Sequence, residues 1–284
     1  MMEQSNIVVS VICNTYNHEL YIRQCLEGFV MQKASFKFEV LIHDDASTDK
    51  TVDIIREYEA QYPDIIKPIY QTENQYSKKT GIMKTFQYPR VKGKYIALCE
   101  GDDYWIDPLK LQKQVDFMEG HPNHSLCFHA HNNEYSNGKS DAIRRYSTDM
   151  IECPMEDIIM GGGGFMATNS MVYKAGIHKS YPEWVKMCPV GDLPLMLLLS
   201  TKGSVGYINE IMSCYRISSI GSWSQRMSCD IKKQIDHNSK IKRMWIAYDS
   251  YTERRYHWII VRKILKNDWN LLKTILLHLI KIFK

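Results

Sequence analysis

Short apolar strands alternate with helical segments over the first 130 residues, and this order restricts the fold more than any other feature. The runs Ile7–Cys13, Phe38–His43 and Tyr95–Cys99 are nearly continuous in apolar and β-branched residues, as expected of strands buried on both faces. Ile65–Tyr70 reads as a weaker strand. Strands joined by helices over short links predict an α/β fold, with a mostly parallel sheet flanked by helices.

Helices are expected between these strands. Apolar residues repeat every four positions over Tyr21–Val30, which predicts an amphipathic helix. A second helix is expected to run to about Tyr62, with Ser47 or Thr48 as its N-cap. Pro108 is placed to open the next helix as its first residue. The first half of the chain therefore reads as repeated strand–helix units.

Polar clusters follow three of the predicted strands. Asn14–Asn17, Asp44–Asp45 and Glu100–Asp103 each stand directly after a strand. In open α/β sheets, ligands bind beyond the carboxyl ends of the strands, so we expect the three clusters to meet at one edge. Asp, Asn and Gly are also common turn formers, and that simpler interpretation stays open for each cluster taken alone.

Acidic residues dominate the third cluster. Glu100, Asp102 and Asp103 place three carboxyl groups within four residues, and adjacent unpaired charges near a protein surface repel by roughly 4 kcal/mol. A cation relieves this repulsion, and oxygen ligands favour Mg²⁺ or Mn²⁺ over zinc. Such a metal binds a phosphorylated substrate and stabilises the charge that develops on its leaving group. Neither a dinucleotide-binding motif nor a P-loop motif is present, and the glycine run 161–164 is interpreted as a loop.

Read together, the three clusters resemble family 2 glycosyltransferases. The segments that carry the resemblance are Val9–Asn17, His43–Asp49 and Glu100–Asp103, and it extends over 6–130 strongly and over 160–225 more loosely. It implies the GT-A nucleotide-diphospho-sugar transferase fold, inverting transfer, and a D-x-D motif that binds metal and diphosphate.

The resemblance also assigns residues on the donor side. Thr15 and Tyr16 line the nucleotide pocket, and Asp45 hydrogen-bonds the base.

The D-x-D motif and a later arginine complete the donor side. Glu100 stands where the family's first Asp is usual, so the resemblance assigns donor binding to Glu100 and Asp102, and metal binding to Asp102 and Asp103. Arg216 is assigned to the diphosphate, because a guanidinium can form two parallel hydrogen bonds with phosphate oxygens.

Inverting transfer needs a carboxylate that takes the proton of the acceptor hydroxyl. Asp192 precedes the apolar segment Leu193–Leu199 and resembles the family's acidic motif, so it is the expected base. The alternative is that it only caps the helix, a contribution of about 1 kcal/mol. Asn169 and Ser170 are candidate acceptor contacts, with ordinary polar strand positions as the alternative. Trp223 is a candidate to stack on a sugar ring or to pack.

A basic tail follows residue 225. Residues 226–284 carry 14 Lys and Arg against 5 Asp and Glu, although the whole chain has a net charge of only +4. From Ile264 onward a narrow polar stripe with lysines adjoins a wide apolar face, which suits a helix in a membrane interface. Anionic lipid attracts each nearby basic residue by about 1 kcal/mol. Packing on the catalytic domain or on another subunit is the alternative, and the aliphatic content disfavours nucleic acid.

These inferences give a catalytic domain over 1–225, with a nucleotide-sugar half (1–130) and an acceptor half (131–225), and an amphipathic helical tail over 226–284. The expected protein is a glycosyltransferase that uses Mg²⁺ or Mn²⁺. It moves a sugar, UDP-linked as the first choice, to a saccharide or lipid-linked acceptor in cell-surface polysaccharide synthesis. A sugar nucleotidyltransferase and a non-catalytic carbohydrate-binding or scaffold protein are the alternatives.

Location follows from features that the sequence lacks. It has no secretion signal at its start and no apolar run of the ~20 residues that a transmembrane helix needs. The eight cysteines form no C-x-x-C pair and suit a reducing compartment. We therefore expect a cytoplasmic protein that residues 257–284 hold at the inner face of the membrane. Homo-oligomer formation stays open.

Overall fold

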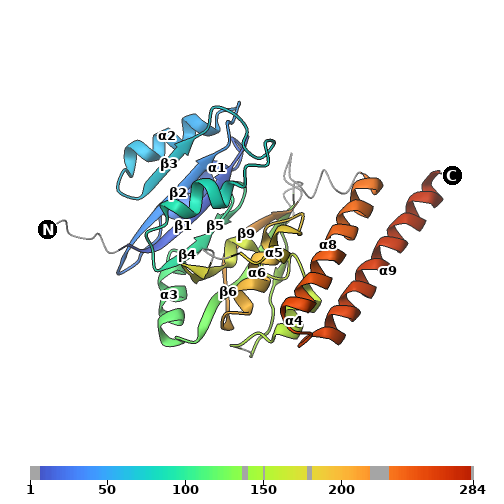
Figure 1. The fold of residues 1–284 in the computed structure, drawn as a ribbon. Helices are drawn as coiled ribbons and strands as arrows, with labels where there is room; N and C mark the ends of the chain where they lie inside the picture. The colour runs from blue at the N-terminus through green and yellow to red at the C-terminus, as the bar shows by residue number, and fades with distance from the viewer. Residues whose placement is uncertain (1–6, 136–139, 150, 178–180, 218–229, 283–284) are drawn as a thin grey trace.

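A computed structural model describes residues 7–135, 140–149, 151–177, 181–217 and 230–282. Over these residues a sheet of nine strands runs in the order β3-β2-β1-β4-β8-β6-β9-β5, with β7 paired to β6 (Figure 1). The strands are β1 (Ile7–Thr15), β2 (Lys37–Asp44), β3 (Ile66–Tyr70), β4 (Tyr95–Leu98), β5 (Tyr104–Trp105), β6 (His124–Tyr135), β7 (Ser140–Arg144), β8 (Val172–Lys174) and β9 (Ser204–Ile217).

The first four strands in this order are parallel. β1 pairs with β2 on one side and with β4 on the other, and β3 pairs with β2. Beyond β4 the sheet is mixed, because β8 runs antiparallel to both β4 and β6, whereas β6 and β9 are parallel. The α/β class expected from strand–helix alternation is thus confirmed, with its parallel part in the first half of the chain.

Alternate strand residues fill two cores, one on each face of the sheet. Along β1, Val9, Val11 and Cys13 belong to the core under α1, α2 and α3, whereas Ile12 belongs to the core under α4, α6 and α8. Helices therefore cover both faces. Their bounds are α1 (Ile22–Val30), α2 (Thr51–Gln61), α3 (Lys110–Gly120), α4 (Met155–Gly161), α5 (Glu183–Lys186), α6 (Asp192–Ser200), α8 (Ile231–Tyr251) and α9 (His257–Ile282).

Two expected helix starts are wrong. α2 begins at Thr51 rather than behind a cap at Ser47 or Thr48. The N-cap position is Lys50, which makes no side-chain cap hydrogen bond. The Thr51 N–H donates to Asp49 Oδ1 at 2.9 Å, so a carboxylate two residues earlier satisfies this free N–H group of the first turn. α3 begins two residues after Pro108, which lies in the preceding turn.

The helical tail packs on the sheet domain through α8 and the start of α9, which lie side by side as an antiparallel pair (Figure 1). The α8 residues Ile241, Met244, Trp245 and Tyr248 are buried in the same core as α4 and α6. The boundary expected after residue 225 therefore does not separate two hydrophobic cores.

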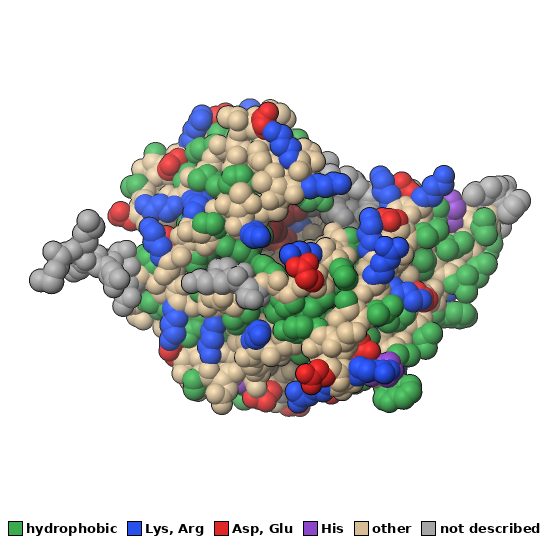
Figure 2. Space-filling model, in the orientation of Figure 1, with side chains coloured by type: hydrophobic (Ala, Val, Ile, Leu, Met, Phe, Trp, Pro, Cys, Tyr) green, Lys and Arg blue, Asp and Glu red, His purple; other side chains and the backbone are tan. Residues whose placement is uncertain are grey.

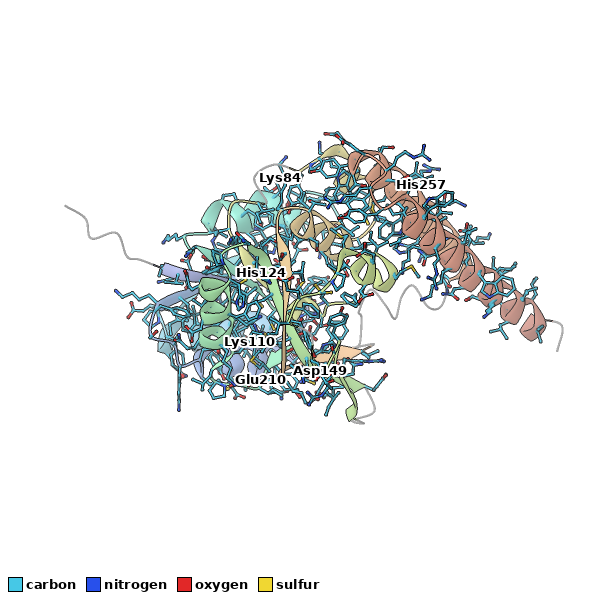
Figure 3. All side chains as sticks on the ribbon, turned by 90° about the horizontal axis from the view of Figure 1, so that it is seen from below. Lys84, Lys110, His124, Asp149, Glu210 and His257 are labelled. Atoms are coloured by element: carbon cyan, nitrogen blue, oxygen red, sulfur yellow. The ribbon has the colours of Figure 1, made fainter. Side chains whose placement is uncertain are left out.

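The outward face of α9 is apolar. Figure 3 shows the helix reaching away from the sheet, with His257 at its start, and Figure 2 shows hydrophobic side chains along its outer edge. Over the described residues, no helix is both long enough and apolar enough to cross a membrane. The exposed large apolar residues of α9 are Trp258, Leu265, Trp269, Leu272, Leu276, Leu277, Leu279 and Ile280.

Candidate active site

The carboxyl ends of β1, β2 and β4 bring the three polar clusters together. Thr15 pairs with Asp44 across the two strands, and the Asp45 N–H donates to the Thr15 carbonyl at 3.0 Å. The Gly101 N–H donates to the Asn14 carbonyl at 3.0 Å, which puts the segment Glu100–Asp103, here called the acidic turn, beside the cluster Asn14–Asn17. The clusters share one sheet edge, as their positions after the strands predicted. Figure 2 shows acidic side chains at the floor of a hollow beneath the lobe that carries α1 and α2.

The residues assigned to the nucleotide differ in their surroundings. Tyr16 is exposed, whereas Thr15 is buried and its hydroxyl has no hydrogen-bond partner among the described residues. Asp45 is also buried, and its carboxylate accepts the N–H groups of Gln75 at 2.7 Å and Tyr76 at 3.0 Å. Asp45 thus fixes the loop after β3. Each carboxylate oxygen can accept a further hydrogen bond, so contact with a base stays a prediction.

The acidic turn keeps its carboxyl groups in mutual repulsion. Burial, and then the charge of Asp102, raises the pKa of Glu100 to about 7. Burial and the same neighbour raise the pKa of Asp103 well above its usual range, although Asp103 Oδ1 accepts the Arg216 N–H at 2.8 Å. Asn14 Nδ2 donates to Glu100 Oε1 at 3.4 Å. This turn therefore has the electrostatic character of a site that favours a cation.

Arg216 lies at the acidic turn and is held there by protein partners. Its Nη1 donates to the Asp102 carbonyl at 2.7 Å, and its Nε lies 3.6 Å from Glu134 Oε1. The rings of Tyr21 and Tyr104 face the guanidinium, with centroids 5.0 and 4.5 Å from its Cζ. Arg216 therefore fixes the backbone of the turn, and its predicted contact with a diphosphate has to use its remaining N–H groups.

Asp192 reaches the same edge from the second half of the chain. It is the first residue of α6, and the N-cap position belongs to Gly191, so the capping alternative is wrong. After burial and Asp102, the charge of Asp192 also raises the pKa of Glu100. Burial raises the pKa of Tyr215, and four carboxylates add to that rise, in the order Asp103, Asp102, Asp192 and Glu100. The expected base and the acidic turn Glu100–Asp103 thus act on one tyrosine.

Asn169 and Ser170 lie inside the fold rather than at this edge. Asn169 Nδ2 donates to the Cys214 carbonyl at 2.8 Å, and its Oδ1 accepts from the Ser213 hydroxyl at 2.9 Å. The Ser170 hydroxyl donates to a backbone carbonyl three residues earlier at 2.6 Å. Both residues are fully buried. They lie in the 3₁₀ turn Thr168–Ser170 rather than in a strand, so the alternative of polar strand positions is wrong as to the element. Trp223 lies outside the described residues.

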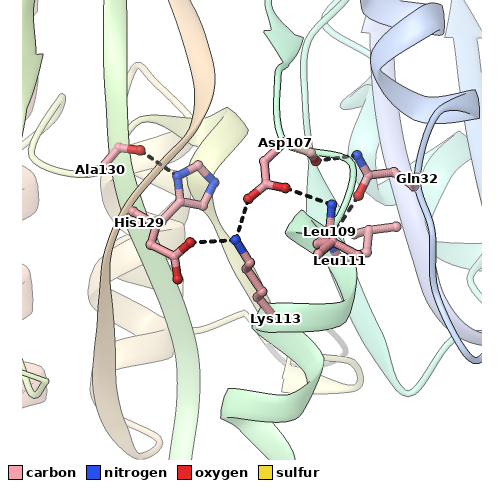
Figure 4. A network of polar contacts seen from close by, with 8 residues as sticks. Gln32, Asp107, Leu109, Leu111, Lys113, His129 and Ala130 are labelled. Carbon is pink, nitrogen blue, oxygen red and sulfur yellow. Dashed lines mark hydrogen bonds and ion pairs between the residues drawn. The ribbon is translucent and has the colours of Figure 1, made fainter.

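A polar network behind the acidic turn holds the chain that leaves it (Figure 4). Gln32 Nε2 donates to the Asp107 carbonyl at 2.8 Å, and Gln32 Oε1 accepts the Leu111 N–H at 3.1 Å. Lys113 bridges the carboxylates of Asp107 and Glu210. The network joins the segment after α1 to α3 and β9, so rigid elements support the turn from behind.

Sequence reasoning missed three titratable residues near the site. Burial lowers the pKa of His18, against the charge of Asp102, and burial lowers the pKa of His237 on α8, against the charge of Asp192. Lys110, at the start of α3 (Figure 3), is fully buried, and burial lowers its pKa to about 7. His18 directly follows the first polar cluster and could have been found from that place. Nothing in the local sequence signals the other two.

A divalent ion fits the acidic turn. Over the described residues, no group of three or more His, Cys, Asp or Glu side chains is arranged to hold a metal by itself. Proteins usually bind Mg²⁺ through one or two carboxylates, with substrate phosphates as further ligands. Asp102 and Asp103 supply hard oxygen ligands in a turn whose carboxylates repel one another. They match a site that a diphosphate completes.

Comparison with known proteins agrees with the sequence resemblance. A sequence model described as "Glycosyl transferase family 2" matches residues 10–177, which is more than half of the chain. An uncharacterized protein of Mycobacterium tuberculosis is 36% identical over 221 residues, covering 76% of this chain and 60% of that relative. The Escherichia coli protein named UDP-Glc:alpha-D-GlcNAc-diphosphoundecaprenol beta-1,3-glucosyltransferase WfaP is 34% identical over 112 residues, or 39% of this chain and 41% of that protein.

Solved structures support the fold. S. aureus TarS 1-349 in complex with UDP-GlcNAc aligns with a TM-score of 0.62 at 17% identity, over 84% of this chain and 66% of that one. The mannosyltransferase PcManGT from Pyrobaculum calidifontis, in complex with GDP-Man and Mn²⁺, aligns with a TM-score of 0.59 at 15% identity, over 95% of this chain and 73% of that one. The chain spans about 60% of the Mycobacterium relative's length. Family match and structural likeness confirm the predicted GT-A architecture, and the chain belongs to glycosyl transferase family 2.

Proposed function

We propose that the protein is an inverting glycosyltransferase that moves a sugar from a nucleotide donor to a hydroxyl group of a saccharide or lipid-linked acceptor. The observation that carries the proposal is the meeting of the three polar clusters at one sheet edge, where the Asp45 N–H donates to the Thr15 carbonyl and the Gly101 N–H to the Asn14 carbonyl, each at 3.0 Å. Asp192 lies close enough to this edge for its charge to contribute to the raised pKa of Glu100. A carboxylate from the second half of the chain and a diphosphate-binding turn from the first half then act on one bound sugar.

The side chains have separate tasks in this reaction. Asp192 accepts the proton of the acceptor hydroxyl as its oxygen attacks the anomeric carbon. The attack comes from the face opposite the leaving diphosphate and so inverts that carbon. Asp102 and Asp103 hold the divalent ion, Mg²⁺ or Mn²⁺, which when bound stabilises the negative charge of the leaving group. Thr15 and Asp45 contact the nucleotide.

A UDP-linked sugar is our first choice of donor, and cell-surface polysaccharide synthesis is the setting we propose. The name of the E. coli relative contains UDP-Glc, and the TarS complex contains UDP-GlcNAc. The PcManGT complex contains GDP-Man instead. These three sugar nucleotides are therefore the natural set for a donor screen.

We also propose that α9 holds the protein against the inner, cytoplasmic face of a membrane, where a lipid-linked acceptor would be presented. Leu265, Trp269 and Leu276 are exposed on its outward face, a surface that water solvates poorly. Lys266 and Lys273 are exposed on the same helix and suit anionic headgroups. The two features together support a helix that lies in the bilayer interface.

Donor binding and turnover test the enzymatic proposal. We expect one of UDP-Glc, UDP-GlcNAc and GDP-Man to raise the melting temperature only when Mn²⁺ is present. Asp103→Asn should abolish that metal-dependent rise. Asp192→Asn should keep it and lower turnover by about 10²–10⁴-fold, the usual contribution of a general base. Asp149→Asn, which changes an exposed carboxylate, is the matched control.

Two results would count against the proposal. A folded protein whose melting temperature responds to none of these donors is not a nucleotide-sugar enzyme of this kind. An Asp192→Asn protein with full turnover would remove Asp192 from the chemistry, and donor binding without any transfer would instead fit a carbohydrate-binding protein.

A further inference from the structure

The glycine run that follows α4 is held by a lysine from α9. Lys263 is buried, and its Nζ donates to the carbonyl oxygens of Met160 at 3.0 Å and Gly161 at 3.3 Å. These are the last carbonyls of α4, where a cation offsets the negative end of the helix dipole. A residue more than 100 positions later in the chain thus fixes the turn Gly161–Gly164.

The turn leaves no room for side chains on the lysine's side. Gly162 has φ +69°, and a Cβ built on it would lie 2.6 Å from Lys263 Nζ. The Gly162 N–H donates to the Ile158 carbonyl at 3.0 Å, and the Gly162 carbonyl accepts the Phe165 N–H at 3.1 Å. Lysine and glycine are therefore matched to each other, because a side chain at position 162 would displace the ammonium group.

The other side of the turn faces the expected base. A Cβ built on Gly163 would lie 3.9 Å from Asp192 Oδ2 and 3.9 Å from Leu193 Cβ. Backbone rather than side chain therefore borders this carboxylate, and the absent side chain leaves space beside it. An acceptor hydroxyl needs such space, because it has to come within hydrogen-bonding distance of the base.

We propose that the turn Gly161–Gly164 forms the acceptor-side wall next to Asp192, and that Lys263 of α9 is the positioning residue that holds this wall. The inference rests on the proposed role of Asp192 as the base. It assigns a structural role in acceptor binding to the glycine run, which has no proposed role in donor binding. It also makes α9 a helix that supports the acceptor site. Small displacements of such a wall are costly, since misplacement by about 1 Å can lower turnover by about 10²-fold.

Kinetics with two variants test the wall. Gly163→Ala adds a methyl group that makes only ordinary van der Waals contact with Asp192, so the protein should fold. With UDP-Glc as donor and α-GlcNAc-diphosphoundecaprenol as acceptor, we expect Gly163→Ala and Lys263→Met to raise the acceptor KM by about tenfold or to lower kcat similarly. The KM for the donor should change by less than about twofold. Lys263→Arg should restore part of the loss, because it keeps the cation.

Exchange measurements test the clamp without any acceptor. Lys263→Met should speed amide hydrogen exchange at Gly162 and Phe165, whose N–H groups are hydrogen-bonded in the turn. Lys232→Met removes an exposed lysine of α8 and is the control, with no change expected.

The outcomes separate this inference from the function on which it rests. If Asp192→Asn loses turnover while Gly163→Ala and Lys263→Met keep wild-type kinetics, the wall is refuted and the base stands. If Lys263→Met fails to fold, Gly163→Ala decides by its acceptor KM. If the tested donor and acceptor give no turnover, unchanged exchange at Gly162 and Phe165 in Lys263→Met refutes the clamp. If Asp192→Asn keeps full turnover, the proposed base itself is wrong.

Discussion

Neutralising Glu100 should stabilise the folded protein, and should do so only above mildly acidic pH. Burial and the charge of Asp102 raise the pKa of Glu100 from 4.5 to about 7. Between these two values the folded protein keeps a proton that the unfolded chain releases, so the free energy of unfolding falls as pH rises across this window. A rise of that size, at about 1.36 kcal/mol per pKa unit, corresponds to about 3 kcal/mol at pH 8. Glu100→Gln removes the cost, and its amide oxygen can still accept the Asn14 hydrogen bond.

Urea unfolding of the metal-free protein at pH 5, 6, 7 and 8 measures this effect. We expect Glu100→Gln and wild type to differ little at pH 5, and Glu100→Gln to be more stable by about 3 kcal/mol at pH 8. Asp64→Asn, at an exposed carboxylate, should give no such divergence. A constant difference between Glu100→Gln and wild type at all four pH values would refute the reasoning, because it would show that no buried charge is being relieved.

Three other changes have defined outcomes. Asp45→Ala should destabilise the protein by about 2 kcal/mol in urea unfolding, because the N–H groups of Gln75 and Tyr76 in the loop after β3 lose the buried carboxylate that accepts them, at about 1 kcal/mol for each hydrogen bond. Trp105→Phe should cost about 1 kcal/mol, since the indole N–H donates to the Asn169 carbonyl at 3.0 Å and the phenyl ring cannot. The double change Leu265→Ser and Leu276→Ser should leave stability in water unchanged but lower binding to anionic vesicles by at least about tenfold in a flotation assay, since each leucine transferred to lipid contributes about 1.5 kcal/mol or more. Unaltered flotation would remove α9 from membrane binding.

The sequence was sufficient to predict the site edge, because that edge follows from strand order. Each strand that ends in the site is an apolar run followed closely by polar residues. β1 ends at Thr15 and β2 at Asp44, and β4 ends at Leu98, two residues before Glu100. Once the strands are parallel, their carboxyl ends have to share a side of the sheet. The acidic turn Glu100–Asp103 could be located from the local sequence alone, whereas its assignment as a D-x-D motif came from the family resemblance.

Features that depend on distant partners were harder to predict. Asn169 has the amide expected of an acceptor contact. Its side-chain amide is hydrogen-bonded to Ser213 and Cys214 of β9, however, and its backbone carbonyl accepts from Trp105 of β5. His237 acts near Asp192 only because α8 folds back over the second core. The start of α2 was misplaced for a local reason, because Ser47 and Thr48 are both good capping residues, whereas the helix begins after Lys50, whose side chain makes no cap hydrogen bond.

The burial of α8 in the second core has a consequence for synthesis on the ribosome. Met244, Trp245 and Tyr248 are fully buried in a core that also holds residues of β6, α4 and α6, all of which are translated before α8. Until α8 leaves the exit tunnel, the underside of the sheet exposes an apolar surface to the cytosol. The first core, with β1, β2 and α1, can close much sooner. We therefore expect the nascent chain to need chaperones from the time the first core forms until α8 has been synthesised and completes the second core.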